Sequence, residues 1–259
     1  MKNTAMPPVE IRTTQTILSL DAVGRDRAAL WFPELVEIGA TSERPVFFDG
    51  PSPCPVWQPR DDSTLGYRVE IPGSLAIDAS IRSEPLGFDL SLELTNASPR
   101  DWKQVISAVC LQLTPAASFL DLTRERTGCV CGGRMRSFAD MKTIGGRPVY
   151  LFAFVRDHTP QKLHGDPTRP GAKWSHTVER PDDGFLWVSA AGSNRTLWMG
   201  WDDSQFLQSN TTPAYGCVHS NPFFGDMASG ASVLRRGRIA VQDGGPKEAH
   251  RAFLEQFGG

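Results

Sequence analysis

The chain has 259 residues, of which 40% are hydrophobic and 22% are charged, and its formal net charge is −2. This length and composition allow a substantial buried core and exclude a largely disordered protein. The charge lacks the basic excess that binding to nucleic-acid phosphates requires, so we expect no nucleic-acid partner. No apolar run approaches the roughly 20 residues of a membrane span, so we expect no membrane partner either.

The first residues and the cysteines bear on the compartment in which the protein works. The start of the chain lacks the apolar core of a secretory signal. The five cysteines are an odd number in a chain large enough to be stable without disulfides, which favours reduced thiols. We therefore expect a cytoplasmic setting, although a mature secreted chain without its leader has the same appearance. The oligomeric state stays open.

Short apolar stretches bounded by Gly, Pro, Asn or Asp predict strands in the first third of the chain. They are residues 16–20, 29–38, 45–48 and 67–71. The stretch 29–38 is also compatible with a short helix.

The clearest strand prediction is residues 88–95, where apolar and polar residues alternate as in a strand with one solvated face. This stretch ends in the turn cluster Asn96-Ala97-Ser98-Pro99. The nearly unbroken apolar run 105–113 then predicts a strand that is covered on both faces. We expect these two strands to be antiparallel neighbours.

The second half of the chain adds four strand predictions, a loop and a helix. The strands are residues 148–155, 185–190, 196–201 and 232–241, and the polar segment 156–183 predicts a long loop. Pro246 is placed to begin a helix whose residues Ala249, Phe253 and Phe257 share one face. Many short strands predict an all-β protein, a single antiparallel β-sandwich domain over residues 1–259 with a short C-terminal helix.

Two stretches resemble the galactose mutarotase-like sandwiches, the fold of aldose 1-epimerases. The first is LSLELTNASPRDWKQVISAVCLQL at residues 90–113, a strand that ends in Thr-Asn, a turn and a buried strand. The second is NPFFGDMASGASVLRRGRIAV at residues 221–241, which is similar to the family's closing segment. The resemblance implies a β-supersandwich with a sugar-binding cleft.

The chain departs from this family where the catalytic groups are expected. The family's buried strand carries a catalytic histidine, whereas this chain has Val109-Cys110-Leu111-Gln112. The family's catalytic base is a glutamate just before the closing segment, whereas this chain has Tyr215-Gly216-Cys217-Val218-His219. Because sugar ring opening needs an acid and a base, the resemblance implies a cleft whose usual chemistry has changed.

His219 is the first candidate for acid–base catalysis. It ends an apolar run just before an Asn-Pro pair that is expected to form a turn, and a strand that ends there delivers the side chain to the rim of a cleft. The ordinary pKa of a histidine lies near neutral pH, so it exchanges a proton without a large shift. Asp202 and Glu125 are the candidate carboxylate partners, and a strand cap is the structural alternative for His219.

Candidate substrate-binding residues are aromatic, amide and cationic side chains, because rings stack on sugars and the polar groups bind hydroxyls or acids. Arg124, Glu125 and Arg126 are expected to alternate on a strand, with both arginines on one face. The structural alternatives are ion pairing on a wet face for these charges, a core Trp198 with a solvated acidic turn at Asp202, and covering of a sheet edge for Trp57. The candidates are Arg124, Arg126, Trp201, Asn210, Asn221, Trp57, Trp174 and His176.

No metal ion or other cofactor is expected. Cys129 and Cys131 are too close in sequence for the usual zinc pair, and we expect their thiols on opposite faces of a strand. For nucleophilic catalysis, the chain has no G-x-S-x-G motif, and a catalytic pairing of Cys110 or Cys217 with His219 is not decided by the sequence. The chain also lacks a Gly-rich phosphate loop followed by a helix.

The sequence therefore predicts a β-sandwich that recognises a carbohydrate, either a small sugar or an oligosaccharide, and acts on it by acid–base chemistry. Two alternatives stay open. One is a non-catalytic glycan-binding or structural sandwich. The other is a metal-dependent sugar-active enzyme that uses the loop histidines His158, His164 and His176.

Overall fold

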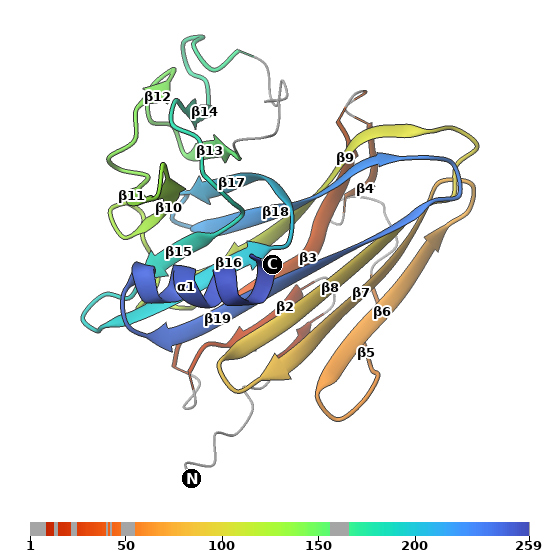
Figure 1. The fold of residues 1–259 in the computed structure, drawn as a ribbon, viewed down its shortest axis with the longest axis horizontal. Helices are drawn as coiled ribbons and strands as arrows, with labels where there is room; N and C mark the ends of the chain where they lie inside the picture. Colours follow the sequence, from red (N-terminus) through yellow and green to blue (C-terminus); the bar gives the residue numbers. More distant parts are fainter. Residues whose placement is uncertain are drawn as a thin grey trace.

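The structure is a computed structural model that describes residues 9–12, 15–21, 25–39, 41, 43–47, 55–155 and 166–258. These residues form two β-sheets that pack face to face, with one helix near the C-terminus (Figure 1). The all-β sandwich with a C-terminal helix that the sequence predicts is confirmed.

The first sheet has ten strands within the described residues, in the order β1-β2-β3-β9-β18-β17-β13-β14-β12, with β4 paired to β3. All of its pairs are antiparallel except β13 with β14. Its strands are β1 Val9–Arg12, β2 Gln15–Ser19, β3 Arg27–Ile38, β4 Glu43–Phe47, β9 Trp102–Gln112, β12 Thr143–Ile144, β13 Tyr150–Phe154, β14 Trp174–Thr177, β17 Ser204–Asn210 and β18 Cys217–Met227.

The second sheet has nine strands within the same described residues, all antiparallel, in the order β11-β10-β15-β16-β19-β8-β7-β6-β5. Its long strands β6, β7, β8 and β19 run side by side in Figure 1. The strands are β5 Gln58–Pro59, β6 Thr64–Ile71, β7 Leu75–Glu84, β8 Gly87–Asn96, β10 Thr127–Cys131, β11 Arg134–Ser137, β15 Leu186–Ser189, β16 Arg195–Trp201 and β19 Ser232–Asp243.

The main hydrophobic core lies between the two sheets and follows from the period-2 pattern of their strands. On β8, Leu90, Leu92 and Leu94 point inward, and the residues between them face outward. On β9, Val109 and Leu111 point into the same core. The alternate residues of β9 are therefore free to build a site on the outer face of the first sheet.

The expected antiparallel pairing of the strands at 88–95 and 105–113 is wrong. Strand β8 belongs to the second sheet and β9 to the first, so the chain crosses between the sheets at residues 97–101. The side chain of Asn96 fixes this crossing, because its Nδ2 donates to the carbonyls of Arg100, Met227 and Ala228. These contacts join β8 to the end of β18, which no local pattern indicates.

Two further expectations are corrected. The turn expected at Asn221-Pro222 does not form, because β18 continues through it to Met227 with irregular pairing to β9. The loop expected at 156–183 contains β14, which pairs with β13 and β12. The stretch 29–38, for which a helix was the alternative, is strand β3.

The helix α1, Pro246–Phe257, covers part of the outer face of the second sheet near β15 and β16 (Figure 1). Pro246 lies in its first turn as predicted. The helix buries Ala249 and Phe253 against Phe185, Trp187 and Trp198. Among the described residues, no helix is long and apolar enough to span a membrane.

Candidate functional site

A pocket of about 860 Å³ lies on the outer face of the first sheet, opposite the core. Its floor and walls come from alternate residues of β9, β18, β17 and β13, whose other residues point inward. On β9, for example, Ala108, Cys110 and Gln112 line the pocket, while Val109 and Leu111 are in the core. The same sheet therefore supplies both the core and the site.

Aromatic and amide side chains form much of the pocket wall. The aromatic group is continuous with a small cluster on this face in which Phe152 contacts both Trp174 and Phe206 edge to face. Such a lining offers ring faces and hydrogen-bonding groups together, as binding sites for polar organic molecules do. The aromatic residues are Trp31, Tyr150, Phe152, Trp174, Phe206 and Tyr215, and the amides are Gln112, Gln208 and Asn210.

The pocket contains a buried cluster of two cysteines and a histidine. Cys217 and His219 are two residues apart on β18 and share one face of the strand. Cys110 on β9 is paired in register with His219. The Cys217 sulfur lies 3.2 Å from His219 Nε2, and the three ligand atoms all lie within 4.8 Å of one another.

The other ring nitrogen of His219 faces a carboxylate. Glu34 on β3 places its Oε2 at 3.8 Å from His219 Nδ1. Burial lowers the pKa of His219, but the sulfur of Cys217 and the carboxylate of Glu34 outweigh this effect and raise the pKa above its ordinary value. The imidazole therefore lies between a sulfur and a carboxylate.

The two thiols of the cluster differ in acidity. A hydrogen bond from the Cys110 thiol lowers the pKa of Cys217 well below its ordinary value, and the charge of His219 acts in the same direction against the effect of burial. The same hydrogen bond, together with burial, raises the pKa of Cys110 well above its ordinary value. Cys217 is therefore the sulfur that carries negative charge most readily.

Two buried nitrogens that line the pocket have no hydrogen-bond partner among the described residues. They are Trp31 Nε1 and His219 Nδ1. A buried N–H without an acceptor costs free energy, so native proteins rarely leave one unsatisfied. These two nitrogens are therefore the unsatisfied buried N–H positions of the pocket among the described residues.

The pocket also holds charged side chains of both signs. Arg44 Nε donates to the Glu37 carboxylate at 2.8 Å, so these two charges compensate each other. Arg169 and Lys173 line the pocket from the segment that precedes β14. Besides the Arg44–Glu37 pair, the pocket therefore has two cations, Arg169 and Lys173, and one carboxylate, Glu34.

The pocket contains three of the residues that the sequence analysis selected. His219 and Asn210 are buried in the pocket wall, and Trp174 closes one side. The Oδ1 of Asn210 accepts from the backbone N–H of Thr212, which fixes the turn after β17. Asn210 also interacts with Cys217 and helps to lower the pKa of its thiol.

Trp201 and Trp57 lie in the core between the sheets and not in the pocket. Trp201 is 1% exposed, and its ring packs 5.8 Å from that of Phe32. Trp57 packs edge to face with Tyr67 at 4.8 Å. Their proposed role as sugar-stacking platforms is therefore corrected to core packing, because neither ring face is open to a ligand.

Residues 122–126 form a series of bends and not the expected strand. The Arg124 side chain is 5% exposed and donates to the carbonyls of Pro148, Val149 and Ser209. Arg126 likewise donates to three carbonyls, those of Ser118, Leu120 and Ser189. Both guanidinium groups therefore hold loops together and do not reach the pocket.

Three other candidates are also placed away from the pocket. Glu125 is exposed on the bend segment. Asn221 is fully buried inside the first sheet, where its Oδ1 accepts from Val109 N and its Nδ2 donates to Phe206 O. His176 stacks on Trp174 with the ring centroids 6.2 Å apart and does not line the pocket itself.

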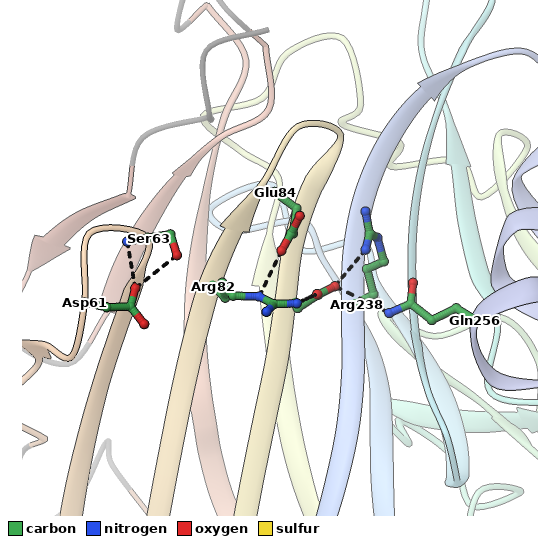
Figure 2. A network of polar contacts seen from close by, with 7 residues as sticks. Asp61, Ser63, Arg82, Glu84, Arg238 and Gln256 are labelled. Atoms are coloured by element: carbon green, nitrogen blue, oxygen red, sulfur yellow. Dashed lines mark hydrogen bonds and ion pairs between the residues drawn. The ribbon is translucent and has the colours of Figure 1, made fainter.

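Asp202 lies at a second, smaller pocket of about 560 Å³ on the outer face of the second sheet. The surroundings of this second pocket are charged. Arg82, Arg238 and Gln256, which are labelled in Figure 2, all contact the carboxylate of Asp89. Burial raises the pKa of Asp202. Because the two pockets lie on opposite outer faces of the sandwich, Asp202 is not a partner of His219.

The remaining cysteine and histidine expectations are answered in part. The Cys129 and Cys131 sulfurs lie 3.8 Å apart on one face of β10, so the expected opposite orientation is wrong. Residues two apart in a strand share a face. His158 and His164 lie outside the described residues.

Several residues of the site were missed by the sequence analysis. Glu34, Trp31 and Tyr150 come from strands far from β18 in the sequence, and only strand pairing brings them together. The adjacency of Cys217 and His219 was within reach, because an i, i+2 spacing in a strand puts two side chains on one face.

The chain is similar in fold to several solved structures. No protein-family model and no curated protein sequence matches this chain. A galactose mutarotase-like protein from Lactobacillus casei is similar at 9% identity and a TM-score of 0.46, over 91% of this chain and 100% of that one. A galactose mutarotase related enzyme from Lactobacillus acidophilus is similar at 7% identity and a TM-score of 0.48, over 93% and 99% of the two chains.

The GalM/aldose epimerase homologue from C. elegans is a third such structure, at 8% identity and a TM-score of 0.45, over 92% of this chain and 99% of that one. These likenesses concern the fold alone.

Proposed function

We propose that the protein binds a carbohydrate or a similar polyol in the pocket on the outer face of the first sheet. The observation that carries this proposal is the lining of the pocket, where aromatic rings stand beside amide groups and two orphaned buried nitrogens. Sugars present apolar C–H faces and closely spaced hydroxyls, which match rings and amides respectively. The volume of about 860 Å³ is in the range of small-molecule sites.

The charges at the pocket favour a ligand that carries a carboxylate or a phosphate. Arg169 and Lys173 face the pocket, and Arg44 is already paired with Glu37. Cations attract an acidic ligand over several ångströms and bind its oxygens directly on arrival. We therefore expect an acidic sugar to bind more tightly than its neutral counterpart.

A binding screen with matched neutral and acidic monosaccharides tests this proposal. Calorimetry and saturation-transfer NMR on the wild-type protein identify the binders. Trp174→Ala is expected to weaken binding of the best sugar at least tenfold, because it removes one wall of the pocket. Asp202→Asn at the second pocket is the control and is expected to leave the affinity unchanged. Absence of binding by every sugar, or equal loss in both variants, rejects the proposal.

Catalysis on the bound sugar is a second candidate function, and the position of His219 favours it. His219 lies in the pocket between the Cys217 sulfur and the Glu34 carboxylate. Asp202 and Glu125 do not line this pocket, so Cys217 and Glu34 take the place of the partners expected from the sequence. We therefore expect a reaction of the bound sugar to use this cluster.

Turnover assays on the sugars that bind test the catalytic candidate. Isomerisation, elimination and hydrolysis are followed by NMR of the sugar itself. A reaction that His219→Gln abolishes while sugar binding persists supports catalysis. Binding without any turnover by the wild-type protein identifies a carbohydrate-binding protein without catalysis.

A further inference from the structure

We propose that Cys110, Cys217 and His219 form a binding site for a zinc ion on the floor of the pocket. Nothing in the sequence predicts this site, because its ligands come from two strands that are distant in the chain and adjacent in the sheet. All three side chains are buried, and all three line the pocket.

The distances between the three ligand atoms suit a tetrahedral ion. Zinc binds cysteine sulfur at about 2.3 Å and histidine nitrogen at about 2.0 Å. At tetrahedral angles these bonds require sulfur–sulfur separations of about 3.8 Å and sulfur–nitrogen separations of about 3.5 Å. The Cys217 sulfur lies 3.2 Å from His219 Nε2, and all three ligand atoms lie within 4.8 Å of one another. Changes of a few tenths of an ångström to about one ångström in the separations of these three atoms therefore give the tetrahedral zinc geometry.

Glu34 supplies a second observation that points to a metal ion. Histidines that bind zinc through one nitrogen almost always donate their other N–H to a carboxylate, a carbonyl or water. Here His219 Nε2 faces the sulfurs, and Nδ1 faces the Glu34 carboxylate at 3.8 Å. Among the described residues, Nδ1 has no hydrogen-bond partner at present, although it is buried. A small movement of Glu34 gives it one.

The donor set selects the ion. Two thiolates and one imidazole suit zinc, whereas magnesium and calcium need oxygen ligands. Three protein ligands leave the fourth position of a tetrahedral zinc ion open, as in catalytic rather than structural sites. Because the three ligands line the pocket, that position faces the space in which a water molecule or a ligand oxygen lies.

This inference does not depend on the identity of the pocket's ligand. Zinc content is measured without any sugar, and sugar binding is measured without added zinc. A protein that binds zinc and no sugar refutes the proposed function alone, and a protein that binds sugar and no zinc refutes this inference alone.

Metal analysis and cobalt titration test the site. Elemental analysis of protein purified under reducing conditions is expected to find one equivalent of zinc. Replacement of zinc by Co²⁺ is expected to give the strong visible absorption of tetrahedral cobalt and a thiolate charge-transfer band at one equivalent. Absence of zinc together with no spectral change on addition of Co²⁺ overturns the proposal.

Matched variants locate the ion. Cys217→Ser and His219→Gln are each expected to weaken Co²⁺ binding at least a hundredfold, and Cys110→Ser is expected to alter the charge-transfer band. Cys129→Ser is the control, because Cys129 and Cys131 are the other close thiol pair among the described residues. Circular dichroism checks that each variant is folded. Cobalt affinity that is unchanged in Cys217→Ser and His219→Gln, or that is lost only in Cys129→Ser, overturns the proposal.

Glu34→Gln tests the carboxylate as a positioning residue without removing a metal ligand. Its Co²⁺ affinity is expected to fall by about 10- to 100-fold, as is typical when such a partner is lost. The melting temperature of the metal-free protein is expected to stay unchanged, whereas the increase produced by zinc becomes smaller. Unchanged cobalt affinity shows that Glu34 does not position His219. The three ligands themselves are tested by the cysteine and histidine variants.

Discussion

Cys110 and His219 are direct partners across strands β9 and β18. They lie in the two stretches where the sequence departs from the galactose mutarotase-like family it resembles, one without the expected histidine and the other without the expected glutamate. The strand pairing makes these two departures a single feature of the molecule. The two strands therefore supply one cluster, in which Cys217 and Glu34 face the two ring nitrogens of His219.

Arg124 is expected to be a stability residue. Its guanidinium is buried, and it donates to the carbonyls of Pro148, Val149 and Ser209 at 2.8, 2.6 and 3.3 Å. Burial and the neighbouring charge of Arg147 lower the pKa of Arg124 to about 10, so the side chain stays charged at neutral pH. Arg124→Gln leaves these acceptors without their donor and is expected to lower the free energy of unfolding by about 2–4 kcal/mol. Urea denaturation measures the change.

The control for Arg124 is an exposed arginine. Arg68 pairs with Glu70 on the surface, where both side chains are more than half exposed. Arg68→Gln is expected to change the free energy of unfolding by less than about 0.5 kcal/mol. Equal effects of the two substitutions contradict the structural role of Arg124.

Asp121 is expected to make stability depend on acid pH. Burial raises the pKa of this carboxyl group, but its hydrogen bonds from Thr127, the Arg126 N–H and Thr123 outweigh this effect and lower the pKa below its ordinary value. The stabilisation is therefore present above the unfolded-state pKa of about 3.9 and is lost as the pH falls through the lower folded-state value. Asp121→Asn is expected to be about 2 kcal/mol less stable at pH 7.

Denaturation at several pH values checks the Asp121 prediction. The difference in unfolding free energy between wild type and Asp121→Asn is expected to shrink below about pH 4. Asp62→Asn, the same substitution at an exposed aspartate, serves as the control. A difference that is constant from pH 7 to pH 3 argues against the hydrogen-bonded carboxylate.

The alternation of apolar and polar residues predicted where strands form better than it predicted which strands pair. The alternation at 88–95 is a local property of half-buried strands, and β8 forms there. The place of β8 in the fold depends on contacts with residues far along the chain, because Asn96 donates hydrogen bonds to the carbonyls of Met227 and Ala228. The Asn-Pro pair of β18 was expected to form a turn, and its Pro cannot donate an N–H to a neighbouring strand. The strand accommodates the pair through irregular pairing with β9 and through the buried side chain of Asn221.

The candidate site was predictable only where its residues are neighbours in the sequence. His219 was selected from its position, and Cys217 shares its face of the strand. Cys110 and Glu34 reach the same pocket from β9 and β3, and no local pattern encodes that register. Conversely, Trp201 and Arg124 have the chemistry of binding residues, but burial and backbone partners give them structural roles.

Asn221 is expected to stabilise the irregular part of the first sheet. Its side chain is fully buried and joins Val109 N on β9 to Phe206 O on β17. Asn221→Ala leaves both backbone groups unpaired and is expected to lower the free energy of unfolding by about 1–3 kcal/mol. Asn221→Asp is expected to be the more damaging change at pH 7, because it buries a charge against a carbonyl. Urea denaturation ranks the two variants, and an aspartate variant as stable as wild type contradicts the geometry.

Gly237 is expected to be required by Trp201. The two residues are register partners on β19 and β16, and a Cβ added at Gly237 meets three atoms of the Trp201 ring at 2.6, 2.7 and 2.8 Å. Gly237→Ala therefore overpacks the core and is expected to lower the free energy of unfolding by about 1–3 kcal/mol. The Trp201 ring is itself confined by Phe32, so it has little room to move.

A double-mutant cycle separates this steric contact from other effects of the two substitutions. Trp201→Phe alone leaves a cavity and is expected to destabilise the protein. In the double variant the smaller ring relieves the overlap with the alanine. Its loss of unfolding free energy is therefore expected to be smaller than the sum of the two single losses by at least about 0.5 kcal/mol. Strict additivity in urea denaturation shows that the two residues do not interact and that the glycine is needed for another reason.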